Sequence, residues 1–185
     1  IIAHGWTDEP LNIDYRDTRI DLSLRDEQLN AQVSMLLPEY MALEGTLRAN
    51  LEGAQSLAGE LHLDMPDLAW LNALTSDITD LSGQAYADIT LSGTLTQPRP
   101  TGRIIVDNLA VNVPLAGVAY ERGRLFIDID AEQQLTLEGQ LAGVSAGELK
   151  FAGSGTLAEL PNWRLQLQID GEDLPLLRTN ELVVD

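Results

Sequence analysis

The residue types that could do chemistry are few in this chain, and the most suggestive of them surround a serine. Gly143-Val144-Ser145-Ala146-Gly147 matches the G-x-S-x-G pattern, in which a sharp strand-to-helix turn exposes a nucleophilic serine. That chemistry needs an acid and a histidine later in the chain to activate the hydroxyl. Both histidines, His4 and His62, precede Ser145, and no helical pattern follows it. We therefore interpret the segment as a loop between two strands, and His62 as a solvent-facing strand residue.

The candidates for metal or cofactor chemistry are equally incomplete. Asp128 and Asp130 resemble two ligands of a calcium loop, but no glycine-containing ligand loop follows them. The stretch 153–158 resembles a dinucleotide-binding loop, but it lies inside a strand pattern and precedes Pro161, so no helix begins there. Two histidines and no cysteine argue against a zinc site. We expect no catalytic residues, no metal and no cofactor, and hence a protein that is not an enzyme.

The charge of the chain restricts its partners. There are 29 acidic and 11 basic residues, which give a formal net charge of −18. Such a surface repels phosphate backbones, so the charge argues against nucleic acid as a partner. It argues equally against docking by charge onto anionic lipid headgroups. The absence of cysteine from the sequence means that the fold relies on no disulfide.

The most informative pattern is Leu-x-Gly-x-Leu or a near copy, which occurs five times. Its glycines are Gly45, Gly59, Gly83, Gly93 and Gly139. Because side chains on a strand alternate between two faces, each glycine shares a face with its flanking leucines. A packed core normally has bulk at such positions, since glycine adds no contacts and weakens a strand. The repeat therefore predicts that these glycines curve a sheet around its apolar face or leave room on that face.

The elements that would position these residues are mostly strands. Apolar and polar residues alternate along nearly the whole chain, as is typical of half-buried strands. The run 81–95 is expected to bend near Gly83 or Gly93, and Pro98, Pro100 and Gly102 predict a turn after it. Short connections between the runs favour an antiparallel meander over parallel crossovers. The expected strands are 20–24, 29–35, 41–51, 57–65, 81–95, 104–106, 109–113, 118–120, 125–129, 135–141, 149–157 and 163–169.

One short helix is expected near 67–78. Leu68, Leu71, Leu74 and Ile78 recur at helical spacing, and Asp67 is suited to cap the start. So short a helix cannot cover the apolar faces of about a dozen strands, which must cover one another or enclose something. We interpret residues 1–185 as a single elongated β domain, and expect it to be a fragment of a longer protein.

Several segments resemble the C-terminal conserved region of the TamB family. These are 91–104, 108–114 with Gly117, 123–127, 137–141, 153–157 and 163–165, with an echo at 171–177. The resemblance implies a long sheet curled into an open, apolar-lined groove, related to AsmA-like and chorein-type lipid-transfer bridges. It also implies a periplasmic protein anchored in the inner membrane of a Gram-negative bacterium, which works with the outer-membrane barrel TamA. The implied roles are assembly and secretion of outer-membrane proteins and transport of phospholipid between the membranes.

From these observations we predict an all-β chain whose sheet forms an apolar groove for phospholipid acyl chains. Alternative readings are a groove for unfolded barrel strands that pair with a sheet edge, a filled β-sandwich, and a spacer that bridges the periplasm. Exposed sheet edges also predict pairing between two copies of the fragment. The predicted lining consists of Leu43, Leu47, Leu61, Leu63, Ile89, Leu91, Leu95, Ile104, Val111, Ile127, Leu137, Leu141, Phe151, Leu165 and Leu167.

Overall fold

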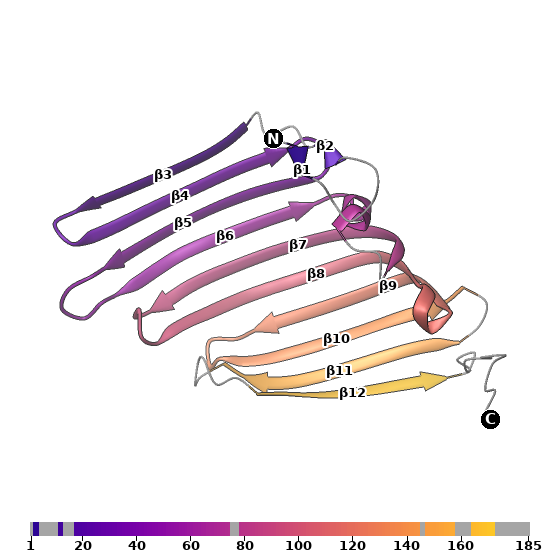
Figure 1. Ribbon diagram of the computed structural model, residues 1–185. Helices are drawn as coiled ribbons and strands as arrows, with labels where there is room; N and C mark the ends of the chain where they lie inside the picture. Colours follow the sequence, from indigo (N-terminus) through magenta and orange to yellow (C-terminus); the bar gives the residue numbers. More distant parts are fainter. Residues whose placement is uncertain are drawn as a thin grey trace, which may run out of the picture.

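The computed structural model describes residues 2–3, 11–12, 17–74, 78–144, 147–157 and 164–172. Most of these residues lie in strands (Figure 1). The elements are β1 (Ile2–Ala3), β2 (Leu11–Asn12), β3 (Asp17–Arg25), β4 (Gln28–Leu37), β5 (Met41–Asn50), β6 (Leu57–Met65), η1 (Ala69–Leu74), β7 (Thr79–Gly93), β8 (Pro98–Val113), η2 (Pro114–Ala116), β9 (Val118–Ile129), β10 (Gln134–Gly143), β11 (Glu148–Thr156) and β12 (Arg164–Glu172).

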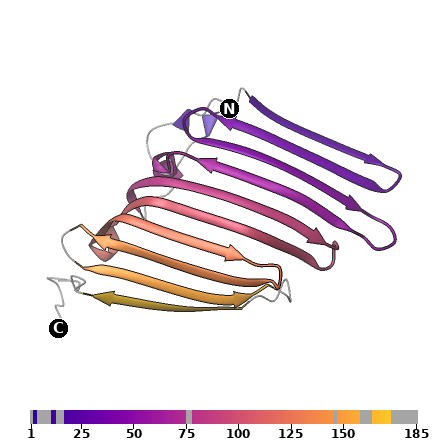
Figure 2. The ribbon, with the colours of Figure 1, turned by 180° about the vertical axis from the view of Figure 1, so that it is seen from behind.

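Strands β3 to β12 form one ten-stranded sheet whose order in space is the order along the chain. Each strand is antiparallel to its neighbours. Strands β3 and β12 are the two edges of this sheet and do not pair with each other, so the sheet is open (Figures 1 and 2). In both views the strands bend along their length, which makes the sheet arched. The predicted all-β antiparallel meander, not closed into a barrel, is confirmed.

The longest strands, β7 and β8, are interrupted by bulges near Gly83. Their pairing register shifts on both sides of Ser82, which pairs with Ala110 of β8, and Asn108 lies within the second shift. Gly83 has a φ of +131° and Asn108 a φ of +53°, values that suit glycine and asparagine in an irregular strand. The bend predicted near Gly83 or Gly93 coincides at Gly83 with this bulge, which is a feature that bends a strand. The two short strands expected at 104–106 and 109–113 form one continuous strand across the bulge.

The turn predicted at Pro98, Pro100 and Gly102 is wrong. These residues lie in β8, paired with Gly93, Leu91 and Ile89 of β7, and the turn occupies residues 94–97 instead. Prolines are tolerated in a strand where only one neighbour needs hydrogen bonds. Strand β8 pairs with β9 only from Gly102 onward, so both prolines precede that pairing.

The expected helix is present as a short 3-10 helix, η1, of six residues. Its start is capped as predicted, because the backbone N–H of Ala69 donates to the Asp67 carboxylate at 2.8 Å. Asn72 ties η1 to the sheet: its amide donates to the carbonyl of Leu81 and accepts from the Leu81 N–H, both at 2.9 Å. The helix thus lies against β7.

The described residues form a single layer with very little interior. The buried apolar residues are Leu37, Ala49, Leu57, Leu68 and Ala87, and no large described side chain is completely buried. Of the two alternatives expected, that the strand faces cover one another or that they enclose something, the first is not met within the described residues. An apolar face of the sheet is left open.

Candidate functional site

The candidate site is one whole face of the sheet, which the strand registers assemble from the alternating apolar residues. Directly paired residues in antiparallel strands point to the same face, so the pairs can be followed from strand to strand. One such row crosses all ten strands: Ile20, Val33, Gly45, Leu61, Ile89, Gly102, Ile129, Leu135, Gly155 and Leu165. We call the surface formed by this row and its parallel neighbours the apolar face.

A parallel row shows that the pattern is continuous over the sheet. It contains Met35, Leu43, Leu63, Ala87, Ile104, Ile127, Leu137, Gly153 and Leu167. The residues between those of the rows, such as Glu44, Asp88, Gln140 and Gln166, belong to the opposite, polar face. A one-residue slip of any strand would exchange the two faces, so the alternation selects these registers.

The structure places the predicted lining on the apolar face, with one exception. Leu43, Leu47, Leu61, Leu63, Ile89, Leu91, Ile104, Ile127, Leu137, Leu141, Phe151, Leu165 and Leu167 belong to its rows. Val111 rejoins the face beyond the β8 bulge, where it pairs with Tyr120. Leu95 is the exception, because it lies in the turn after β7, with its N–H bonded to the Gln55 carbonyl. Whether these residues contact a ligand stays a prediction.

Exposure on the apolar face increases toward the edges of the sheet. On β3, Ile20, Leu22 and Leu24 are 62–69% exposed, and on β12 Leu167 and Ile169 are 52% and 59% exposed. Apolar side chains in the central strands are mostly half-buried by their neighbours in the same layer. A continuous exposed apolar surface of this kind marks a site of contact with a protein, a membrane or a ligand.

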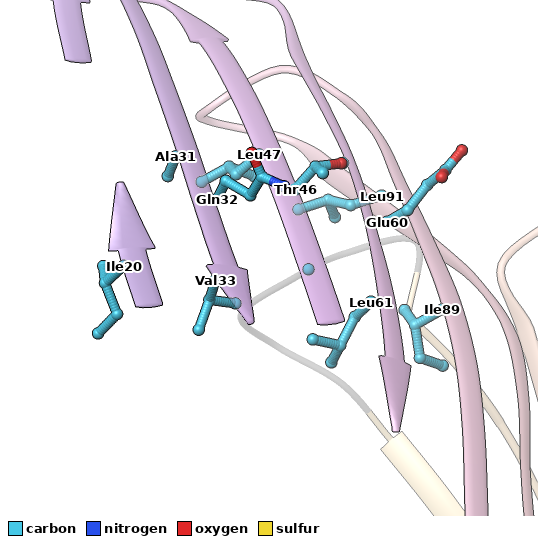
Figure 3. A pocket seen from close by; sticks show the side chains of 12 residues that line it. Ile20, Ala31, Gln32, Val33, Thr46, Leu47, Glu60, Leu61, Ile89 and Leu91 are labelled. Carbon is cyan, nitrogen blue, oxygen red and sulfur yellow. The ribbon is translucent and has the colours of Figure 1, made fainter. Parts of the chain in front are cut away.

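The clearest hollow in the apolar face lies where two glycines of adjacent strands meet. It has a volume of about 320 Å³ and is lined by the sheet from β3 to β7. Gly45 lies between Val33 and Leu61 in the first row, and Gly59 lies between Leu47 and Leu91 in the next. Figure 3 shows the side chains of Ile20, Val33, Leu61 and Ile89 extending in one direction, while the Glu60 carboxylate points elsewhere. We call this hollow the glycine notch.

A different glycine of the face is already covered. Gly139 pairs with Phe151, and a Cβ added at Gly139 would overlap the Phe151 ring. The ring therefore fills the space that the missing side chain leaves, an arrangement that stabilises strand glycines. The notch at Gly45 and Gly59 has no aromatic residue in its lining, so it stays open.

The five glycines of the repeat lie in different local settings. Gly45, Gly59 and Gly139 occupy regular positions in paired strands. Gly83 lies at the bulge, and Gly93 ends β7 with a φ of +95°, at a tight turn. A role for these glycines in curving the sheet stays a prediction.

The polar face carries the charged residues in exposed pairs across strands. His62 Nδ1 lies 2.5 Å from Asp88 Oδ1, directly opposite it, so the prediction of a solvent-facing His62 is confirmed. The hydrogen bond to Asp88, and then its charge, raise the pKa of the His62 imidazole above 6.5. Arg103 donates to Asp128 at 2.9 Å in the same manner. Such exposed pairs contribute little to stability.

The two aspartates considered as calcium ligands have structural partners. Asp128 is paired with Arg103, and Asp130 accepts the N–H of Gln134 at 2.8 Å in a turn, so both have structural partners. In the described part of the chain, His, Asp and Glu side chains do not form a group of three able to hold a metal ion. Ser145 and His4 lie outside the described residues.

Sequence reasoning missed part of the site. The notch is lined also by Ile20, Ala31 and Val33, which belong to strands recognised from their alternation but were not included in the predicted lining. The pairing of β3 with β4 would have identified them, because Ile20 pairs with Val33 and paired residues point to the same face. Within the described residues, no helix has both the length and the apolar character needed to span a bilayer.

Comparison with known proteins identifies a family. The family model described as "TamB, N-terminal domain" matches residues 2–106, more than half of the chain. The predicted assignment to the C-terminal conserved region is not confirmed, because the matching model is that of the N-terminal domain. No curated protein and no solved structure shows a significant match.

Proposed function

Since the chain belongs to the TamB family, we propose that its apolar face is a non-enzymatic conduit for phospholipid acyl chains in the bacterial envelope. In this proposal the full-length protein is anchored in the inner membrane and crosses the periplasm as part of the translocation and assembly module. TamA, the outer-membrane barrel, is its partner through the full-length protein. The observation that carries the proposal is the apolar face, continuous over ten strands and uncovered within the described residues.

The energetics of the face suit transport better than tight binding. Each CH₂ group removed from water contributes about 0.8 kcal/mol, wherever along the rows it lies. The attraction is non-directional, so a chain can slide from strand to strand without breaking hydrogen bonds. Headgroups would stay in water beyond the sheet, since the charged side chains lie mainly on the polar face. The net charge of −18 also disfavours holding phosphate groups by charge.

A second candidate function is supported by the edges of the sheet. Strands β3 and β12 each have one side without a partner strand in the described sheet, and both expose apolar side chains. Such edges can accept a further strand, from an unfolded outer-membrane protein or a second copy of the chain. Assembly of outer-membrane proteins would then use the edges, whereas lipid would use the face. A passive spacer would use neither.

A photo-crosslinking experiment in cells distinguishes these functions. A photoreactive amino acid at Leu61 or Leu137 of the full-length protein points to the apolar face, and one at Thr90 or Gln140 points to the polar face. We expect phospholipid to be captured from the first two positions and not from their matched controls. Equal capture from both faces, or none, would refute the conduit. Capture of outer-membrane protein precursors, with no lipid, would favour the strand-pairing function.

A further inference from the structure

We propose that the glycine notch at Gly45 and Gly59 is a discrete seat for one hydrocarbon chain on the apolar face, and that these glycines determine where the chain rests. The inference depends on the proposed conduit function and adds a fixed position to it. A uniform apolar surface would hold a chain equally well anywhere. The notch breaks that uniformity, because its hollow of about 320 Å³ lets a chain contact walls as well as a floor.

The walls of the notch come from large side chains beside the glycines. Val33 and Leu61 flank Gly45, and a Cβ added there would lie 3.0 Å from Val33 Cγ1 and 3.2 Å from Leu61 Cδ1. Leu47 and Leu91 pair with Gly59, where an added Cβ would lie 2.5 Å from the Thr46 carbonyl oxygen and 3.1 Å from Leu47 Cδ1. A side chain at either glycine would crowd its neighbours, so the glycines keep the floor of the hollow low between β-branched and leucine side chains, which contact a chain from both sides.

The chemistry of the lining selects a hydrocarbon occupant. Strands β4 to β7 are paired with one another through the notch, so their backbone N–H and C=O groups are already bonded within the sheet. A peptide laid across this face would find no partners for its own backbone groups, and leaving them unpaired is costly. No charged side chain is available to bind a headgroup, since Glu60 reaches the notch from the polar face. A neutral chain without hydrogen-bonding groups meets no such cost.

In the described C-terminal half of the face, the repeat glycine Gly139 is covered, unlike Gly45 and Gly59. There, the Phe151 ring lies over Gly139 and fills the space beside it. The glycine repeat therefore has one open and one filled form, and only the open form offers a seat. We therefore expect a hydrocarbon chain to occupy the N-terminal half of the face more than the C-terminal half, although both halves have the same alternating pattern.

The test uses the full chain with vesicles of phosphatidylcholine that carry a photoactivatable diazirine in the acyl chain. After irradiation, mass spectrometry locates the label. We expect it mainly in the segments 43–47, 59–63 and 89–91. The variant Gly45→Val fills the notch and should weaken labelling about tenfold, the effect of displacing about two methylene groups. The matched control is Gly153→Val on the same face, where an added Cβ would be 3.2 Å from the Gln166 carbonyl oxygen, a crowding similar to that at Gly45.

A second variant tests the same notch in case Gly45→Val does not fold. Ala31→Leu fills the notch from β4, and circular dichroism checks that each variant keeps its strands. Label spread evenly over both halves, with no loss in either variant, would overturn the seat while leaving the conduit intact. No label anywhere would overturn both. With a photoreactive amino acid at Leu61 in the same vesicles, crosslinks between two copies of the chain in place of lipid would assign the notch to a protein contact and overturn the hydrocarbon occupant.

Discussion

The contact between the Phe151 ring and Gly139 predicts that Gly139→Ala changes the free energy of unfolding in opposite directions with and without the ring. In the native chain, Gly139→Ala places a methyl group where the ring lies, so the ring must move. Overpacking of this kind costs about 1–3 kcal/mol. In a Phe151→Ala background the space is empty, and the same substitution should stabilise the protein by about 0.5–1 kcal/mol, because alanine restricts the unfolded chain more than glycine does. The two effects of one methyl group thus have opposite signs.

The size of the coupling follows from the same geometry. Phe151→Ala alone should cost less than the ~3–5 kcal/mol of a fully buried phenylalanine, since Phe151 is half-buried. The double-mutant cycle should then give a coupling of about 2 kcal/mol between residues 139 and 151. Urea unfolding of the four proteins measures it, provided that the m-values agree. A substitution at Gly139 with the same sign and size in both backgrounds would refute the idea that the ring fills the glycine's space.

Two further predictions concern the polar face and the end of the sheet. The imidazole of His62 should titrate above pH 6.5 by NMR and return toward that value in Asp88→Asn, because Asp88 raises its pKa. The pair's contribution to stability is present below pH 6.5 and is lost as the pH rises through the folded-state pKa; an unchanged titration in Asp88→Asn would contradict this. Asn72→Ala should destabilise the protein by about 1–3 kcal/mol in urea unfolding, because it leaves both backbone groups of Leu81 without their side-chain partner. A cost below about 0.5 kcal/mol would mean that water replaces these bonds.

Much of the sheet could be predicted because its signal is local. Alternation such as Leu135, Leu137 and Leu141 against Thr136 and Gln140 identifies a strand and both of its faces at once. Short turns then leave neighbouring strands antiparallel. Asp67 identified the start of η1 for the same reason, since capping depends on residues close in sequence.

The errors arose where a neighbour in space overrides the local signal. Pro98 and Pro100 are typical turn residues, yet they fit β8 because β9 has not begun to pair there. Leu95 follows the alternation but lies in the turn, where its N–H bonds to Gln55. The positions of these prolines and of Leu95 can be predicted only when the neighbouring strands are known.

The two faces of the sheet and their composition follow from the amino-acid sequence alone. Period-two alternation with short connections permits few arrangements other than an antiparallel meander with one apolar face. That the sheet stays open is visible only in the folded chain, because closure depends on twist and stagger accumulated over all ten strands. It is also only in the folded chain that Gly45 and Gly59 meet in an open notch while Phe151 covers Gly139. Those contacts run between strands, so they depend on a register that no single strand contains.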